Sequence, residues 1–237
     1  MGILMKFALK NIKAIIFDLD GVITDTSDLH TKAWKKMADE EKIPFDNETS
    51  EKLRGVSRQK SLEIILEDAK NKYGFTKTFT DEQFKELMER KNNYYVENLY
   101  FITPKNLLEG AKDVIDFFKS RGYKVAVGSS SKNARLVLKK LEIENYFDVV
   151  IDGTEIVYSK PHPEIFQKVA DKLGISCEKC AVVEDAASGI ESANTAGMVS
   201  IGIGQEDRFK KENQITKLRF DNMKDFLIYL YDISLPK

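Results

Sequence analysis

Residues 14–26, AIIFDLDGVITDT, combine a short apolar run with closely spaced carboxylates. The run Ala14–Phe17 is typical of a strand buried on both faces of a parallel sheet. Side chains two apart on an extended backbone leave on the same side. Asp18 and Asp20 are therefore predicted to point together past the carboxyl end of the strand, where open α/β sheets bind ligands, and Gly21 allows a sharp turn there. Two like charges this close need a divalent metal, a shared proton, or both.

The composition of the 237 residues allows one large domain or a core with a smaller insertion. The 37 Lys and Arg against 38 Asp and Glu give a formal net charge of -1, which argues against a general field for nucleic acid or an anionic membrane. No apolar run is long enough to span a bilayer, and the start, MGILMKFALKNIK, lacks the pattern of a secretory signal or of myristoylation. We expect a cytoplasmic protein that is monomeric by default.

The two cysteines, Cys177 and Cys180, have the spacing C-x-x-C. A zinc site needs four ligands, whereas the histidines, His30 and His162, lie in other motifs. A thioredoxin-type pair would open a helix after a strand, but Cys180 begins an apolar run. We interpret the spacing as coincidental, exclude a disulfide scaffold and assign His162 no role.

Helical spacing of apolar residues follows the first strand for about 75 residues, with no strand pattern between the segments 27–42, 53–72 and 80–100. From residue 110 the pattern alternates, with helices predicted at 110–121, 133–141, 163–173 and 188–196 and strands at 124–128, 149–151, 180–184 and 199–203. Repeated βα units predict an α/β fold, a Rossmann-like doubly wound parallel sheet.

The first predicted strand can bury its faces only by joining the later strands. We therefore expect a Rossmann-like core of residues 1–24 and 104–237 with an inserted helical cap domain, residues 25–103. The hinges between them are expected near residues 24–28 and 100–107.

Three further motifs follow predicted strands. Residues 128–133, GSSSKN, offer hydroxyls and a helix start to an oxygen anion, although a serine-rich helix cap looks similar. In residues 159–163, SKPHP, two prolines hold Lys160, which is expected to bridge Asp18 and a phosphoryl group unless it is a solvated surface lysine.

The third motif is residues 182–189, VVEDAASG, in which Glu184 and Asp185 are expected to converge on Asp18 and Asp20. The predicted Mg²⁺ site takes the side chains of Asp18 and Asp185, the backbone carbonyl of Asp20, and Glu184 directly or through water. The alternative for Asp185 is a helix N-cap.

The string DLDGVITDT, with these motifs, resembles the signature of the haloacid dehalogenase (HAD) superfamily of phosphoryl-transfer enzymes. The resemblance implies that Asp18 attacks phosphorus and that Asp20 is the general acid and base. A carboxylate approaching a phosphate dianion is repelled, so Mg²⁺ is expected between them.

A closer resemblance, over about residues 14–204, is to the β-phosphoglucomutase family. It is carried by the same string with His30 and Trp34, by LRGVSR at 53–58, by Ser61 and by RKN at 90–92, together with SSSKN, SKP and VVEDAASGI. It implies that a phosphorylated Asp18 exchanges its group with a sugar phosphate through β-glucose 1,6-bisphosphate. Ser129 and Lys160 would hold the moving phosphoryl group.

The same resemblance implies a second pocket for the phosphate that does not react. Arg58 of the cap would bind it together with Ser131, Lys132 and Asn133 of the core, because a guanidinium can grip phosphate with two donors. The residues implied around the sugar are Gly55, Val56, Ser57, Ser61, Lys91, Trp34 and Ser130.

His30 is expected to couple cap closure to protonation of Asp20, and Thr26 to orient Asp20. A core-facing Trp34 and a solvated Lys91 remain alternatives. Two departures from the family pattern are Arg54, where Lys is expected, and Ser130, where Ala is usual; residues 68–80 are interpreted as a cap insertion.

The residues therefore predict a Mg²⁺-dependent mutase that interconverts β-D-glucose 1-phosphate and D-glucose 6-phosphate. A phosphatase of the same fold, in which water dephosphorylates Asp18, is the alternative, and a non-enzymatic binding module is a third class. Arg58 favours the mutase, because a monoester phosphatase gains nothing from a second phosphate pocket. Neither the sugar nor its anomer follows from the sequence.

Overall fold

The computed structural model describes residues 9, 11–209 and 215–232. Its centre is a parallel sheet of six strands in the order β3-β2-β1-β4-β5-β6. The strands are β1 (Ala14–Phe17), β2 (Lys124–Gly128), β3 (Val149–Ile151), β4 (Cys180–Glu184), β5 (Val199–Ile203) and β6 (Leu218–Phe220). Because the strand order reverses between β1 and β4, the carboxyl ends of these two strands flank the crevice in which such sheets bind ligands. The predicted doubly wound α/β fold is thus confirmed.

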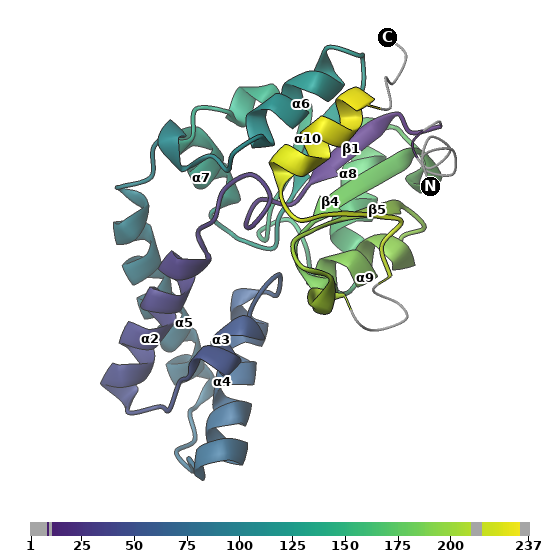
Figure 1. Cartoon of the computed structure of the whole chain (residues 1–237). Coiled ribbons are helices and arrows are strands. Elements are labelled where there is room, and N and C mark those ends of the chain that lie inside the picture. Colours follow the sequence, from purple (N-terminus) through teal and green to yellow (C-terminus); the bar gives the residue numbers. More distant parts are fainter. Residues whose placement is uncertain (1–8, 10, 210–214, 233–237) are drawn as a thin grey trace.

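Helices cover both faces of the sheet, as Figure 1 shows. Ile15 and Phe17 of β1 pack in one apolar cluster with side chains of α6 (Ala111–Lys119), α7 (Ala134–Lys140) and α10 (Met223–Asp232). The alternate residues, Ala14 and Ile16, pack in a second cluster with α8 (Glu164–Leu173) and α9 (Ala187–Thr195). A strand whose every side chain is buried explains the unbroken apolar run.

Of the five α-helices between β1 and β2 in the sequence, the first four form a separate lobe beside the sheet, as Figure 1 shows. They are α2 (Ser27–Glu41), α3 (Asn47–Glu51), α4 (Arg58–Tyr73) and α5 (Asp81–Leu99). They have a small core of their own, in which Trp34, Met37, Leu62, Ile65 and Leu87 are buried. Other residues of α2 and α5, namely Ala33, Tyr95 and Leu99, pack in the cluster of the sheet lobe, so the two lobes also share apolar contacts.

The two chain crossings between the lobes lie side by side. Thr24 donates a hydrogen bond from Oγ1 to the backbone oxygen of Asn106 at 2.7 Å, and the Leu108 amide donates to the oxygen of Ile23 at 2.9 Å. A short 3-10 helix, Pro104–Asn106, lies on the returning crossing. These contacts lie where both hinges are expected.

Some expected elements begin elsewhere or were not predicted. The predicted helix at 53–72 is wrong at its start, because Gly55 has φ +73° and Ser57 is an extended N-cap, so α4 begins at Arg58. Helix α3 was not predicted, nor were β6 and α10. The two cysteines are free, and Cys180 begins β4.

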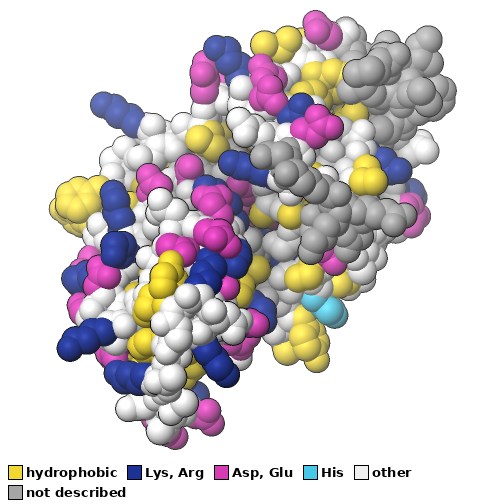
Figure 2. All heavy atoms as spheres, turned by 60° about the horizontal axis from the view of Figure 1, so that its bottom comes forward, with side chains coloured by type: hydrophobic (Ala, Val, Ile, Leu, Met, Phe, Trp, Pro, Cys, Tyr) yellow, Lys and Arg dark blue, Asp and Glu magenta, His cyan; other side chains and the backbone are white. Residues whose placement is uncertain are grey.

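Lys and Arg side chains are interspersed with Asp and Glu on the face seen in Figure 2. No helix among the described residues is long and apolar enough to cross a membrane.

Candidate active site

A buried carboxylate cluster lies where β1 and β4 end. Asp18, Glu184 and Asp185 each offer a carboxylate oxygen, and these oxygens lie within 4.8 Å of one another. Burial, together with the neighbouring charges of Glu184 and Asp20, raises the pKa of Asp18 to about 7 although Lys160 opposes the shift. Burial and then the charges of Glu184 and Asp18 also raise the pKa of Asp185. So much negative charge in one place calls for a bound cation.

Lys160 lies at the bottom of this cluster. Its Nζ donates to Asp18 Oδ1 at 2.5 Å and to Glu184 Oε1 at 2.7 Å, and the side chain is buried. Burial alone would lower the pKa of Lys160, but its contacts with the two carboxylates outweigh that effect and raise it. The alternative of a solvated surface lysine is thus wrong, and the ammonium is held charged against Asp18.

Asp20 is reached by a chain of hydroxyl groups from the helical lobe. Thr26 donates from Oγ1 to Asp20 Oδ1, and the hydroxyl of Tyr95 lies 3.0 Å from the same Thr26 oxygen. When Asp20 is ionised it can only accept from Thr26, and Tyr95 is then the donor in its contact with Thr26. Desolvation raises the pKa of Asp20, against the opposing Thr26 bond. The raised pKa and the hydroxyl contact fit an Asp20 carboxyl that can gain and lose a proton.

His30 and Lys91 form a pair above this chain. Lys91 Nζ lies 2.7 Å from His30 Nδ1, and the His30 ring stacks on Tyr95 with centroids 3.9 Å apart. Desolvation and then the positive charges of Lys91 and Arg58 hold the pKa of His30 well below its usual range, so a neutral His30 accepts from Lys91. Lys91 is buried, so the alternative of a solvated lysine is wrong. Trp34 is buried in the core of the helical lobe and also lines the cavity.

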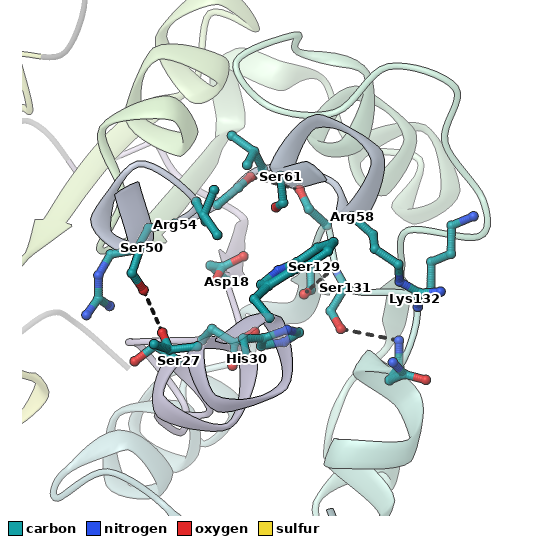
Figure 3. A pocket seen from close by; sticks show the side chains of 18 of the residues that line it. Asp18, Ser27, His30, Ser50, Arg54, Arg58, Ser61, Ser129, Ser131 and Lys132 are labelled. Carbon is teal, nitrogen blue, oxygen red and sulfur yellow. Dashed lines mark hydrogen bonds between the residues drawn. The ribbon is translucent and has the colours of Figure 1, made fainter. Parts of the chain in front are cut away.

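Arg58 at the start of α4 and Asn133 at the N-cap of α7 meet through one side chain, Asn92 of α5. Asn92 Oδ1 accepts from Arg58 Nη2 at 2.7 Å and from Asn133 Nδ2 at 2.9 Å. Figure 3 shows Arg58, Ser131 and Lys132 together on one side of Asp18. The helical lobe and the sheet thus present polar donors to the same space.

A cavity of about 110 Å³ between the lobes joins these groups. Most of the sequence-predicted site residues line it, namely Asp18, Asp20, His30, Trp34, Gly55, Val56, Arg58, Ser61, Lys91, Ser129, Ser130, Ser131, Lys132, Asn133 and Asp185. Three do not: Lys160 and Glu184 are buried beside Asp18, and the Ser57 hydroxyl caps α4 by accepting from the Lys60 amide at 3.2 Å.

The turn before α4 contacts the sheet lobe directly. Ser130 Oγ donates to the Gly55 oxygen at 3.1 Å, and Ser188 Oγ to the Arg54 oxygen at 3.4 Å. A Cβ on Gly55 would lie 2.6 Å from Ser188 Oγ, so glycine permits this close approach. The two lobes therefore touch each other beside the cavity, which is their closed arrangement.

Several residues of the site were not predicted. Arg54 and Arg208 each place Nη1 3.6 Å from Asp185 Oδ2, one from each lobe. Ser27, Thr31, Ser50, Glu51 and Leu53 also line the cavity. Asn92 is adjacent to Lys91 in the RKN string, but nothing in the sequence indicates that it contacts Asn133.

The carboxylate cluster fits Mg²⁺, which prefers oxygen ligands. A Cβ on Gly21 would overlap the Asp185 carboxylate, and one on Gly189 would overlap Glu184. The chain thus leaves room for both acids where they approach Asp18, an arrangement suited to a shared cation rather than to separate surface acids.

The fold and the site define a class of phosphoryl-transfer enzyme, and comparison with known proteins agrees. A family profile described as a haloacid dehalogenase-like hydrolase matches residues 12–197, and the chain belongs to this family. It is 42% identical to a β-phosphoglucomutase of Bacillus subtilis over 195 residues, which are 82% of this chain and 84% of that protein.

Two further similar proteins are a phosphatase and a mutase. A phosphorylated carbohydrates phosphatase of Thermotoga maritima is 30% identical over 192 residues, covering 80% of this chain and 84% of that one. The crystal structure of a β-phosphoglucomutase from Clostridium difficile superimposes with a TM-score of 0.85 at 38% identity, covering 94% of this chain and 96% of the other.

Proposed function

We propose that this chain is a Mg²⁺-dependent β-phosphoglucomutase. It interconverts β-D-glucose 1-phosphate and D-glucose 6-phosphate through a phosphorylated Asp18 and β-glucose 1,6-bisphosphate. In this proposal it acts as a cytoplasmic monomer on free sugar phosphates. The division into a core of residues 1–24 and 104–237 and a cap of residues 25–103 belongs to the same proposal, and the paired crossings near Thr24 and Asn106 support it.

The observation that carries the proposal is a single cavity with two different ends. Asp18 lines this cavity, and Arg58, Ser131 and Lys132 lie together on one side of it (Figure 3). A sugar bisphosphate has a phosphate at each end, so it matches a site with an acidic, metal-binding end and a basic, donor-rich end. A small monoester would leave the second end without a ligand.

The residues supply a balanced sequence of steps. When the sugar hydroxyl attacks phosphorylated Asp18, the bond between phosphorus and Asp18 breaks and Asp20 takes the hydroxyl proton. After the bisphosphate turns over, an Asp18 oxygen attacks the other phosphate and Asp20 returns its proton to the departing sugar oxygen. Lys160 offsets the negative charge that develops around the transferred group.

Mg²⁺ would be held by Asp18, Asp185 and the backbone carbonyl of Asp20, with Glu184 directly or through water. When bound, it would reduce the repulsion between the Asp18 carboxylate and the phosphate. Thr26 and Tyr95 orient Asp20 through their hydroxyl chain, and the neutral His30 holds Lys91 beside it.

The test is an incubation with Mg²⁺, β-glucose 1-phosphate and a trace of β-glucose 1,6-bisphosphate. We expect glucose 6-phosphate to form with little inorganic phosphate. Release of phosphate in proportion to substrate loss would instead establish the phosphatase, the alternative that the Thermotoga relative keeps in view. Asp18→Asn should abolish both activities.

The second end of the cavity has its own test. Arg58→Ala should harm mutase turnover but spare hydrolysis of a small ester such as p-nitrophenyl phosphate, since that ester has no distal phosphate. Equal loss of both activities would show that Arg58 does not bind a distal phosphate.

A further inference from the structure

Asn92 lies where the helical lobe and the sheet lobe exchange hydrogen bonds behind the cavity. Its Oδ1 accepts at once from Arg58 of α4, at 2.7 Å, and from Asn133 at the N-cap of α7, at 2.9 Å. The two donors are 75 residues apart in the sequence and belong to different lobes. One amide oxygen therefore fixes the distance between them.

Neither donor is used up by this contact. A guanidinium has five N–H groups and a carboxamide has two, and each gives one to Asn92. Arg58 and Asn133 line the cavity, whereas Asn92 is not among the lining residues. Asn92 thus holds both side chains from behind and leaves their other donors for a ligand.

Asn92 is uncharged, and this affects how strongly Arg58 can bind an anion. The hydrogen-bond partner of the Arg58 guanidinium is the neutral Asn92 Oδ1, and desolvation lowers the pKa of Arg58 although the charge of Glu89 opposes that shift. An amide partner orients the guanidinium without neutralising it, so its full charge is available to an anion. A carboxylate at this position would compete with that anion.

We propose that Asn92 is a positioning residue, which presents Arg58 and Asn133 as a pair to the distal phosphate of the sugar bisphosphate. This inference rests on the proposed function. It adds a residue of α5 to the pocket for the distal phosphate, and it gives the contact between the two lobes a hydrogen bond that lies beside the ligand.

The experiment compares Asn92→Ala with Asn93→Ala, a matched control on the exposed side of the same helix. Mutase kcat and KM for β-glucose 1-phosphate are measured at saturating bisphosphate, with p-nitrophenyl phosphate hydrolysis as a measure of the intact core. Loss of two positioning hydrogen bonds should raise KM about tenfold with kcat changed less than about threefold. Asn93→Ala should match the wild type, and hydrolysis should be unchanged in both variants.

Asn92→Asp supplies a second variant that preserves the shape of the side chain. It retains an acceptor oxygen but pairs with the Arg58 charge, so KM should rise further than in Asn92→Ala. An unchanged KM in Asn92→Ala or in Asn92→Asp would overturn the inference.

The double variant Arg58→Ala/Asn92→Ala separates positioning from an independent effect. If Asn92 acts through Arg58 and Asn133, removing its side chain should raise KM by a clearly smaller factor in the Arg58→Ala background than in the wild type. Full additivity would overturn the inference. If Arg58→Ala itself leaves mutase kinetics unchanged, the proposed function fails; if Arg58→Ala raises KM and Asn92→Ala does not, only the role of Asn92 fails.

Discussion

Two glycines allow the carboxylates of the site to approach one another. Gly21 has φ +79°, and a Cβ there would overlap the Asp185 carboxylate; a Cβ on Gly189 would overlap Glu184. The turn after β1 therefore needs glycine for its conformation and also for the space that Asp185 occupies. These two requirements can be separated by substitution.

Gly21→Ala is compared with Gly122→Ala, since Gly122 has φ +80° but nothing within 4 Å of an added Cβ. Both variants carry a left-handed alanine, which costs about 1 kcal/mol of stability. Only Gly21→Ala should also displace Asp185. Its turnover should then fall about 100-fold, and its affinity for Mg²⁺ should also fall. Thermal melts and a Mg²⁺ titration of activity measure both effects. Equal turnover in the two variants would contradict the steric role of Gly21.

Lys91 is a buried amine, and its burial costs stability. Desolvation, and then the charge of Arg58, holds its pKa well below the usual range. Lys91→Met should therefore leave the melting temperature unchanged or raise it, because replacing a buried amine by an apolar chain of similar length removes a desolvation cost. Mutase turnover should fall at least about tenfold as His30 and Asp20 lose their neighbour. A strongly lowered melting temperature would identify Lys91 as a structural residue.

At the scale of elements, the N-caps of α4 and α5 offer a matched pair of hydroxyl groups. Ser57 Oγ accepts from the Lys60 amide, and Thr80 Oγ1 accepts from the Gln83 amide in a capping box. Ser57→Ala and Thr80→Ala should each cost about 1 kcal/mol in the free energy of unfolding, measured in urea. Only Ser57→Ala should also impair mutase turnover, since Arg58 is the first residue of α4. Equal turnover in both would show that the start of α4 is held by other contacts.

The sequence predicted the elements with strong local patterns. Four strands have the predicted bounds because buried parallel strands are continuous apolar runs, and β1 coincides with the first run. Helix α3 has only five residues, too few for a helical period to be read, and β6 has an exposed Arg219 at its centre, so it lacks the continuous apolar run of the other strands. The start of α4 was predicted too early because the helical spacing of apolar residues in 53–72 does not reveal the turn at Gly55.

The site divides in the same way. Carboxylates that follow neighbouring parallel strands must lie at one edge of the sheet, so the meeting of Asp18 with Glu184 and Asp185 could be predicted. The contacts of Asn92 and Arg208 depend on how separate segments pack in three dimensions. No local pattern encodes such contacts.

At the scale of the whole molecule, one cation from each lobe lies beside the carboxylate cluster. Arg54 comes from the helical lobe and Arg208 from the sheet lobe, and both lie 3.6 Å from the same oxygen of Asp185. Lys160 already contacts Asp18 and Glu184 from below. The cluster is thus only partly compensated by the protein, so its charge links metal binding to the stability of the folded chain.

That link has a definite sign with pH. The pKa of Asp18 is about 7 in the folded, metal-free protein, against an ordinary value of 3.8. Between these values the folded chain holds a proton that the unfolded chain has released, so the contribution of Asp18 to stability falls as pH rises through this window. Asp20 and Asp185, whose pKa values are also raised, act in the same direction.

Mg²⁺ binds the ionised carboxylates, so at about pH 5.5 it must displace a proton from Asp18, whereas at about pH 7.5 most of the Asp18 carboxyl is already ionised. We expect the rise in melting temperature on adding Mg²⁺ to be larger at the higher pH. A ligand stabilises the folded state more when its affinity is higher, and the affinity for Mg²⁺ is higher where the carboxylates are ionised. Asp18→Asn should show a smaller rise that differs less between the two pH values, since its amide neither ionises nor supplies an anionic ligand. Calorimetry of both proteins, with Ca²⁺-free buffers and EDTA as the metal-free reference, measures this. A Mg²⁺-induced rise that is equal at both pH values in the wild type would show that these carboxylates do not hold the metal.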